Sequence, residues 1–311
     1  MRIMVTGANG FVGKHLVRQL SGKNDEIVAV LGPTGNSWPE SMDTFLFAKV
    51  TADLTQKEVV RGLVQEYQPE QVYHLAGLAV TRGYSFDQYY NINVQSTMNM
   101  AESVLDVRGS KCDVLHVSSS AVYGGSSEVP YEETAPLRPS GDYALSKAFA
   151  ELALWSSIAR GLHAKIVRPF NHTGPFQGPG FVCPDMVLRI KQAMKLNAGT
   201  PEREVTIYNP EAVRDFTDVR DVVRAYELVM KEFRPGEVVN VASGIGTSVR
   251  RIAAILKNKV PTEGLPFREV NSADAGFIVG NSSLLMRRTG WKPAFRLEQT
   301  LEDLWDELLG E

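Results

Sequence analysis

The feature that most constrains the fold is a glycine-rich turn near the start of the chain. Residues 2–6 form a short apolar run typical of a strand, glycines follow at positions 7, 10 and 13, and an amphipathic helix is predicted to about residue 20. Such glycines let the backbone turn tightly and approach a pyrophosphate, which then binds the amides at the helix N-terminus. The position of the turn between a first strand and a first helix strengthens this interpretation. The residues predicted to contact a dinucleotide here are Gly7, Gly10, Phe11, Val12 and Gly13.

Strand-like and helical patterns alternate after this turn. Short apolar runs occupy 26–31, 49–52 and 71–75, and the last two each precede a helical stretch. The alternation predicts an α/β fold with a doubly wound, parallel, Rossmann-like sheet. A chain of 311 residues has room for two interleaved domains. We expect a dinucleotide-binding domain at 1–167 plus about 214–242, and a smaller α/β substrate domain at 168–213 plus about 243–311.

The carboxyl ends of two of these strands supply further candidates for a cofactor crevice. Asp53 follows one strand and can either reach the adenine amino group or cap the helix after it. Ala76 and Gly77 follow another strand, and their lack of bulk lets a cofactor pass. The cofactor-binding residues predicted at these strand ends are Asp53, Leu54, Leu75, Ala76 and Gly77.

The loop after the second predicted strand bears on the choice between NAD and NADP. A NAD site usually places an acidic residue there to accept from the ribose 2′-hydroxyl, but no carboxylate occurs between Leu31 and Ser37. Thr34, Asn36 and Ser37 can donate to a 2′-phosphate, although the arginine typical of NADP sites is missing. We therefore expect NADPH as the preferred cofactor, with NADH accepted. If the loop is only surface, the specificity lies elsewhere.

Tyr143 and Lys147 stand four residues apart at the start of a helix predicted over 143–160. Residues at this spacing share one helix face, so both can meet one ligand, although most such pairs have no catalytic role. A nearby ammonium favours a phenolate, so we expect Lys147 to lower the pKa of Tyr143 from about 10 toward neutrality. Ser119, or its neighbour Ser120, can orient a reacting carbonyl. The predicted catalytic residues are Ser119, Tyr143 and Lys147.

The charge balance and the cysteines exclude several classes of protein. Lysine and arginine total 33 against 36 aspartate and glutamate, which gives no sign of a nucleic-acid or membrane-surface partner. Cys112 and Cys183 have no paired spacing, so neither a disulfide framework nor a metal site is predicted. The chain begins directly with a predicted strand and has no apolar run of membrane-spanning length, so we expect a cytoplasmic protein.

Two predicted helices, at 91–107 and 143–160, bear on assembly. Both carry more apolar residues at helical spacing than one internal face needs. Ordinary packing against the sheet is one explanation, and a paired-helix interface is the other. We therefore expect a homodimer.

Motifs spread from one end of the chain to the other resemble the extended short-chain dehydrogenase/reductase superfamily. In the first half they are the turn at 7–13, Asp53-Leu54, His74-Leu75-Ala76-Gly77, Asn93-Val94, the serine strand at 117–120 and Tyr143-x-x-x-Lys147. Later motifs look like the nucleotide-sugar branch of that superfamily. They are 168–175 (Arg-Pro-Phe-Asn-His-Thr-Gly-Pro), 214–222 (Arg-Asp-Phe-Thr-Asp-Val-Arg-Asp-Val) and 290–293 (Gly-Trp-Lys-Pro).

Within that branch, the motif at 169–175, followed by Gln177 and 181–182, looks most like the reductases of GDP-linked 4-keto-6-deoxy sugars. The resemblance implies NADPH-dependent reduction of the C4 keto group of GDP-4-keto-6-deoxy-D-mannose to GDP-D-rhamnose. It leaves His172 either as an extra acid-base group or as a structural residue. The implied substrate-binding residues are Ser119, Ser120, Asn171, Arg189 and Arg214.

Related activities remain open. Ala121 stands where dehydratases of this branch carry a carboxylate and where epimerase-reductases carry a cysteine, and alanine cannot move a proton. Ser119, Tyr143 and Lys147 suffice for a carbonyl reduction or for a 4-epimerase that retains NAD, while a redox-sensing protein on this fold needs no proton donor. The chain reads Asn-Ser-Ala-Asp at 271–274, where related enzymes carry an Arg-Pro pair, and Gly-Asn at 280–281, where Gly-Asp is usual. One clamp for the substrate diphosphate is therefore absent, and more of the binding is expected from Arg214.

Overall fold

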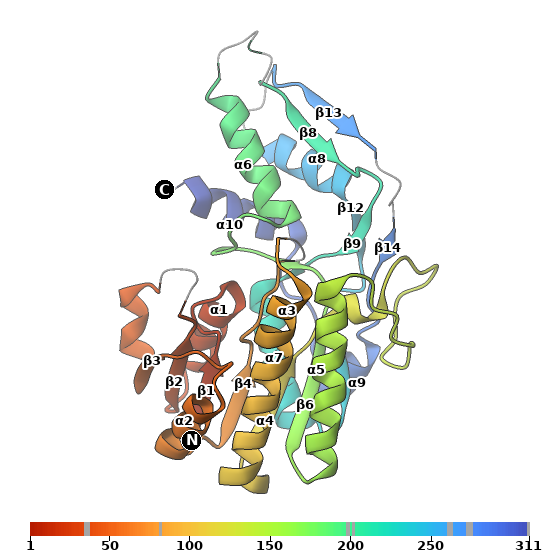
Figure 1. Cartoon of the computed structure of the whole chain (residues 1–311). Coiled ribbons are helices and arrows are strands. Elements are labelled where there is room, and N and C mark those ends of the chain that lie inside the picture. The colour runs from red at the N-terminus through yellow and green to blue at the C-terminus, as the bar shows by residue number, and fades with distance from the viewer. Residues whose placement is uncertain are drawn as a thin grey trace.

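A parallel sheet forms the centre of the computed structural model, which describes residues 1–33, 38–80, 83–196, 200, 203–259, 264–271 and 276–309 (Figure 1). Within these ranges the sheet has seven strands in the order β11-β6-β5-β4-β1-β2-β3, and each neighbouring pair is parallel. The arrangement confirms the predicted doubly wound α/β fold. The strands are β1 (Arg2–Thr6), β2 (Glu26–Leu31), β3 (Ala48–Thr51), β4 (Gln71–His74), β5 (Asp113–Val117), β6 (His163–Pro169) and β11 (Val238–Val241).

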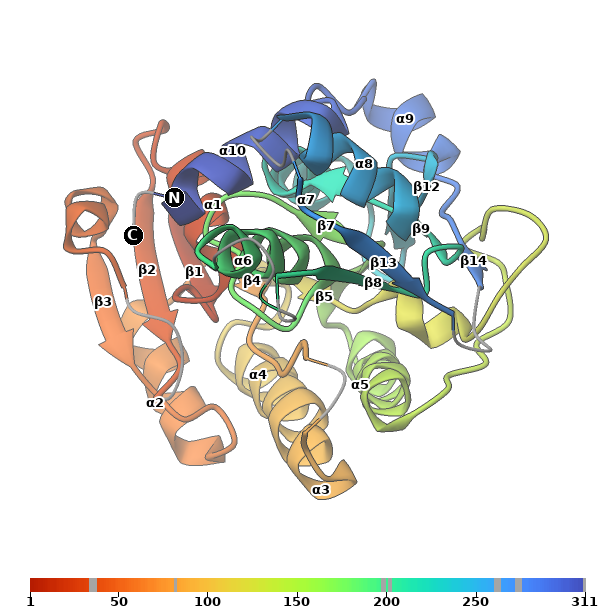
Figure 2. The ribbon, with the colours of Figure 1, turned by 90° about the horizontal axis from the view of Figure 1, so that it is seen from above.

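Helices cover both faces of this sheet, and strand β1 shows how the sequence divides its side chains between them. Successive side chains of a strand point to opposite faces. Ile3 and Val5 pack in the core shared with α1 (Phe11–Leu20) and α7 (Val219–Glu232). Met4 packs in the opposite core, whose helices are α2 (Lys57–Tyr67), α4 (Ser96–Val107) and α5 (Asp142–Ala159). Figure 2 shows α4 and α5 side by side on that second face.

The segment leading into α4 differs from the single helix predicted over 91–107. A short helix, α3 (Phe86–Tyr89), begins with a capping box formed by Ser85 and Gln88. Residues Tyr90–Gln95 then form a π-helix before α4 starts. A π-helical turn adds a residue to the turn and changes which side chains face inward. Asn93 lies in this turn and is only 1% exposed.

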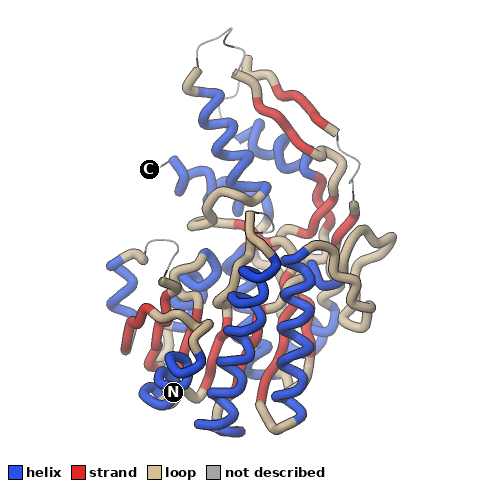
Figure 3. Tube along the Cα trace, viewed as in Figure 1, coloured by secondary structure: helices blue, strands red, loops and turns tan. Residues whose placement is uncertain are grey.

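A smaller layer sits over the carboxyl ends of the large sheet (Figures 1 and 3). Its core joins helices and short strands through buried residues such as Val187, Ile190, Ile252, Leu256 and Leu301. Its helices are α6 (Val182–Met194), α8 (Val249–Lys259) and α10 (Leu297–Leu309). Its strands are β8 (Val205–Tyr208), paired with β13 (Phe267–Val270), and β9 (Val213–Asp215), which lies between β12 (Gly246–Ser248) and β14 (Phe277–Ile278).

Short elements connect the two layers. β7 (His172–Thr173) pairs with β10 (Thr217–Asp218). The 3₁₀-helices are η1 (Glu40–Phe45), η3 (Gly109–Lys111) and η4 (Ser120–Tyr123). Helix α9 (Ser283–Thr289) packs against α7 and β11, and Leu285 and Trp291 join the core beneath the large sheet. These two residues fall within the predicted substrate-domain segment 243–311, and the domain boundaries themselves stay a prediction.

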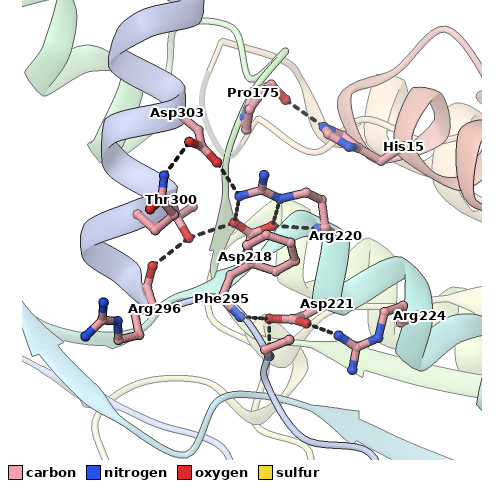
Figure 4. A network of polar contacts seen from close by, with 12 residues as sticks. His15, Pro175, Asp218, Arg220, Asp221, Arg224, Phe295, Arg296, Thr300 and Asp303 are labelled. Carbon is pink, nitrogen blue, oxygen red and sulfur yellow. Dashed lines mark hydrogen bonds and ion pairs between the residues drawn. The ribbon is translucent and has the colours of Figure 1, made fainter.

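Two buried carboxylates, Asp218 and Asp221, bind α7 to the segment at 294–303 near the end of the chain (Figure 4). Asp218, at the start of α7, binds the guanidinium of Arg220 and accepts a hydrogen bond from the Thr300 hydroxyl at 2.7 Å. Arg220 also pairs with Asp303 at 2.7 Å, so one guanidinium joins α7 to α10. Because Asp218 is 3% exposed, its charge is compensated inside the protein.

Asp221, one turn further along α7, makes a second contact between α7 and the segment that leads into α10. Its carboxylate forms an ion pair with Arg224 at 2.6 Å. The same carboxylate accepts hydrogen bonds from the backbone amides of Ala294 at 2.9 Å and Phe295 at 3.0 Å. Asp221 therefore supplies the acceptor for two amides of the segment that leads into α10.

The described residues also bear on membranes, disulfides and metals. No helix among them combines the length and apolarity that crossing a membrane requires. Cys112 and Cys183 are both buried and unpaired with each other. In the same part of the chain no three or more His, Cys, Asp or Glu side chains gather as a metal site would require.

Replacing Asp221 should weaken the whole fold. Asp221→Ala leaves the amides of Ala294 and Phe295 without an acceptor, so the free energy of unfolding should fall by about 3 kcal/mol. Urea denaturation followed by circular dichroism measures this change. Asp306→Ala, at an exposed position of α10, is the control and should change the same quantity by less than about 0.5 kcal/mol. Equal effects of the two variants would contradict the assignment.

Candidate active site

The glycine turn between β1 and α1 is closely packed against the end of β4. Gly7 has a φ of +66°, and a Cβ added to it would lie 2.8 Å from the backbone nitrogen of Ala76. A Cβ on Gly13 would lie 2.3 Å from the carbonyl oxygen of Gly7. The N-cap of α1 is Gly10, and the first turn carries no acidic residue. These properties fit a pyrophosphate, which needs close backbone approach and uncapped amides at Phe11, Val12 and Gly13.

The side of the crevice predicted for adenosine is held by local hydrogen bonds. Asp53 Oδ1 accepts from the backbone amide of Thr55 at 3.0 Å and from its hydroxyl at 2.8 Å, so this carboxylate shapes the turn before α2. Asn9, which the sequence-based reasoning missed, accepts at Oδ1 from the amide of Gly32 at 3.0 Å. It therefore ties the glycine turn to the loop after β2. Thr34, Asn36 and Ser37 lie outside the described residues.

The packing of the remaining predicted cofactor residues differs among them. Leu54 is buried in the core under α2 and α4, so its side chain serves that core. Leu75 is half-buried and packs on the opposite core. A Cβ added to Gly77 would lie 2.8 Å from Asn93 Oδ1 and 3.3 Å from Lys147 Nζ, so a larger residue would displace these two side chains. The backbone at Gly77 therefore brings the end of β4 next to the predicted catalytic lysine.

The structure brings the three predicted catalytic side chains together. Ser119 lies between β5 and η4, while Tyr143 and Lys147 lie one turn apart at the start of α5. The Tyr143 phenol is hydrogen bonded to the Ser119 side chain. Lys147 Nζ donates to the carbonyl oxygen of Val117 at 3.0 Å. A hydroxyl, a phenol and an ammonium thus meet at the carboxyl end of β5.

The electrostatics of this group differ from the sequence-based expectation. Burial raises the pKa of Tyr143, and the hydrogen bond with Ser119 only partly opposes the rise. Burial lowers the pKa of Lys147 to about 8, against the attraction of Glu151. The expectation that Lys147 lowers the pKa of Tyr143 is therefore wrong for this structure, because the penalty for burying a phenolate dominates. Tyr143 is a neutral phenol that can donate a proton.

Two supporting groups were missed by the sequence-based reasoning. The side chain of Asn93 accepts from the amide of Leu78 at 2.7 Å and donates to the hydroxyl of Ser146 at 2.9 Å. It thus joins the segment after β4 to the catalytic helix α5. The Asn93-Val94 motif was a signal for this position, but periodicity alone predicted an ordinary helix there.

A buried ion pair under Lys147 is the other supporting group. Glu151 follows Lys147 by one turn of α5 and binds the guanidinium of Arg168, at 2.6 Å from Nη2. Glu151 also accepts from the Ser118 hydroxyl, and Arg168 donates to the Tyr123 hydroxyl at 3.0 Å. The helical spacing from Lys147 to Glu151 was a visible signal for one partner. The arginine on β6 was not predictable as the other.

The predicted residues Asn171, Ser120 and His172 differ in exposure and contacts. Asn171 is exposed, and Ser120 is buried at the start of η4. The ring of His172 stacks on Phe11 at a centroid distance of 5.9 Å, and its Nδ1 hydrogen bonds with the carbonyl oxygen of Phe170 at 2.9 Å. Burial lowers the pKa of His172. This favours the structural interpretation of His172 over the acid-base one.

The two predicted arginines belong to the smaller layer. Arg189 on α6 lies 5.0 Å over the ring of Tyr208 and donates to the carbonyl oxygen of Thr206 at 3.4 Å. Arg214 on β9 donates to the carbonyl oxygens of Val213 and Gly276. Both side chains are half-buried.

A large hollow in the described surface lies elsewhere. It has a volume of about 740 Å³ and separates the loop after η4 from the segment before α9, with Tyr131, Glu132, Arg138 and Asn281 among its lining residues. None of Ser119, Tyr143 and Lys147 lines it. The catalytic group and this hollow are therefore separate features.

Comparisons with known proteins agree with this geometry. A family model described as "NAD dependent epimerase/dehydratase family" matches residues 3–242. GDP-6-deoxy-D-mannose reductase of Pseudomonas aeruginosa is 30% identical and is aligned over 100% of this chain and 99% of its own length. UDP-glucose 4-epimerase of Mycolicibacterium smegmatis is also 30% identical, over 96% of each chain. The solved structure of RMD from Pseudomonas aeruginosa, complexed with NADPH, has a TM-score of 0.81 at 27% identity and covers 100% of this chain and 99% of its own.

Lys147 should lose its proton at a lower pH than an ordinary lysine, near pH 8. Its lowered pKa means that the ammonium is fully present well below pH about 8 and is lost as the pH rises through that value. Titration of the protein with ¹³C-labelled lysine, followed by NMR, should show one side chain changing near this pH. Lys57 is the internal control, because Glu102 raises its pKa and keeps it charged over the same range. A Lys147 resonance that titrates only near the ordinary lysine pKa of about 10.4 would contradict the prediction.

Proposed function

Because this chain belongs to the NAD dependent epimerase/dehydratase family, we propose that it uses NADPH to reduce the C4 keto group of GDP-4-keto-6-deoxy-D-mannose, giving GDP-D-rhamnose. The coarser assignment follows from the family and its relatives: the chain is an NAD(P)-dependent enzyme that modifies nucleotide sugars. The finer one draws support from the reductase that matches over the full length and from the NADPH complex of RMD.

The observation that carries a carbonyl reduction, rather than a dehydration, is the meeting of Tyr143, Ser119 and Lys147 at the carboxyl end of β5. A carbonyl that is reduced needs a proton on its oxygen, and a phenol with a raised pKa holds one at neutral pH. The backbone amide of Ala121 donates to Ser119 Oγ at 3.1 Å. Ala121 therefore lies next to the catalytic hydroxyl, and its methyl group cannot act as the base that a dehydratase requires.

The proposed chemistry assigns one task to each catalytic side chain. The nicotinamide of the cofactor supplies the hydride for the carbonyl carbon. Ser119 donates a hydrogen bond to the carbonyl oxygen and holds it next to Tyr143. Tyr143 donates its proton to that oxygen, and the ammonium of Lys147 stabilises the phenolate that remains. Most of the acceleration comes from holding the carbonyl in this geometry.

The proposed binding residues divide between the two layers. NADPH rather than NADH is favoured by the NADPH complex of RMD and by the lack of a carboxylate at the end of β2, where the chain reads Leu31-Gly32-Pro33. The residues proposed to hold the cofactor are Gly7, Gly10, Phe11, Val12, Gly13, Asp53, Leu54, Leu75, Ala76, Gly77, Tyr143 and Lys147. Those proposed to hold the nucleotide sugar are Ser119, Ser120, Asn171, Arg189 and Arg214.

The reductase proposal is tested by mixing the protein with GDP-4-keto-6-deoxy-D-mannose and NADPH. NADPH absorbance should fall, and NMR should identify GDP-D-rhamnose as the product. Tyr143→Phe removes the proton donor, so kcat should fall by about 10²- to 10⁴-fold. Tyr67→Phe, on α2, is the matched control and should keep the wild-type kcat. A Tyr143→Phe variant that turned over at the wild-type rate would exclude Tyr143 as the donor.

A 4-epimerase is the second candidate, favoured by the 30% identity with UDP-glucose 4-epimerase. An epimerase recycles its cofactor and keeps it bound, whereas a reductase must release it after each turnover. No NADPH consumption, together with NAD that stays bound through purification, would favour the epimerase. The protein would then be assayed with UDP-sugars and dTDP-sugars.

The proposal includes a homodimer that pairs through α5. Phe149, Leu152 and Trp155 recur along this helix and are 38%, 59% and 40% exposed. Large apolar side chains gathered at helical spacing on a surface are typical of an interface. The expected partner face is the same helix of a second copy, because identical patches pair in a twofold dimer.

Leu152→Glu should disrupt this dimer. A buried, unpaired carboxylate is costly, so the variant should elute and scatter light as a monomer, whereas the wild-type chain should behave as a dimer. Size-exclusion chromatography with light scattering measures both. Leu188→Glu, at the 37% exposed Leu188 on α6, is the matched control and should stay dimeric. A wild-type monomer would contradict the proposal.

A further inference from the structure

His74, at the end of β4, is buried and takes part in none of the steps proposed above. It is 1% exposed and belongs to the motif that precedes Gly77. Its Nδ1 lies 2.9 Å from the hydroxyl of Thr6, and its Nε2 lies 3.2 Å from the hydroxyl of Thr97 on α4. The imidazole therefore connects the end of β1 to a helix on one face of the sheet.

The neighbouring hydrogen bonds determine which nitrogen of His74 carries the proton. The Thr97 hydroxyl donates its single hydrogen to the carbonyl oxygen of Asn93 at 2.7 Å, so it can only accept from His74. Nε2 is then the protonated nitrogen, and Nδ1 accepts from the Thr6 hydroxyl. Thr6 Oγ1 in turn accepts from the backbone amide of Ala76 at 3.2 Å. His74 therefore donates from Nε2 to Thr97 and accepts at Nδ1 from Thr6.

The environment keeps His74 neutral. Burial, together with the nearby charge of Lys147, lowers its pKa to about 3. The ring of His116 on β5 stacks against it at a centroid distance of 5.9 Å. His116 is also buried, and burial lowers its pKa well below the ordinary value. Both donor and acceptor functions of His74 are thus preserved across the neutral range.

The two ends of this chain of hydrogen bonds reach the two halves of the candidate active site. One end is the Ala76 amide, next to the backbone of Gly77. The other end is Asn93, whose backbone carbonyl accepts from Thr97; its separate side chain donates to Ser146 at 2.9 Å, and Ser146 donates to the carbonyl oxygen of Tyr143 at 2.8 Å. Together these contacts join the ends of β1 and β4, beside the glycine turn, to the first turn of α5.

We propose that His74, as its Nε2–H tautomer, is a positioning residue that holds the cofactor-side strand ends in register with the helix carrying Tyr143 and Lys147. The proposal rests on the proposed function for its effect on turnover. The expected tautomer of His74 and the expected contribution of His74 to dinucleotide binding do not depend on which sugar the enzyme takes.

Thr97 offers a test that leaves the catalytic and binding residues unchanged. Thr97→Val keeps the shape but removes the acceptor for Nε2–H, so the Kd for NADPH should rise about tenfold and kcat should fall about tenfold. Thr97→Ser keeps the hydroxyl and should restore both values to within about twofold of wild type. Ser103→Ala is the control on the same helix, because that buried hydroxyl has no partner among the described residues. It should leave both values unchanged.

A spectroscopic measurement tests the tautomer directly. Long-range ¹H–¹⁵N NMR of histidine-labelled protein should show His74 protonated on Nε2 in the wild type and in Thr97→Ser. An Nδ1–H signal in the wild type would overturn the proposal, as would a Thr97→Val variant with wild-type NADPH affinity and kcat. If the wild-type protein fails to reduce the keto sugar but Thr97→Val still weakens NADPH binding, the reductase proposal fails and the role of His74 stands.

Discussion

The buried ion pair between Glu151 and Arg168 is the interaction on which the geometry of the candidate active site depends. Glu151 is 1% exposed and Arg168 is 5% exposed, so neither charge can be satisfied by water. Loss of one partner of such a pair costs about 3–5 kcal/mol, because the other is left uncompensated. The pair joins α5, one turn after Lys147, to β6, whose end leads into the smaller layer. The catalytic helix therefore cannot slide along the sheet without separating two buried charges.

The features predictable from sequence were those set by local spacing. The strand at 26–31, the end of α1 near residue 20 and the shared helix face of Tyr143 and Lys147 all follow from periodicity and from glycine positions. The residues of the catalytic group were identified in the same way, although their assigned roles stay a proposal. Ser119 was selected differently, as a hydroxyl that can orient a reacting carbonyl, and the structure brings it to the Tyr143 phenol.

The features that escaped prediction depend on packing between distant segments. Periodicity could not reveal the π-helical turn that buries Asn93, because that turn is stabilised by contacts with the segment after β4 and with α5. The predicted direction of the Tyr143 pKa shift was wrong for the same reason, because the burial of this phenol depends on several elements together. Arg189 and Arg214 were selected as charges, and the structure finds them in contact with strands of the smaller layer.

The position of α9 and Trp291 has a consequence for the synthesis of this chain. Helix α7 covers one face of the large sheet, and β11 is an edge strand of that sheet. Leu285 and Trp291 complete the core on the same face. All of these residues follow residue 218 in the sequence. A nascent chain that ends before this point presents the apolar face formed by β1 and α1 to its surroundings. Exposed apolar surface and an unpaired strand edge make such an intermediate prone to aggregation. This apolar face therefore stays uncovered during synthesis until the residues of α7, β11 and α9 have been made.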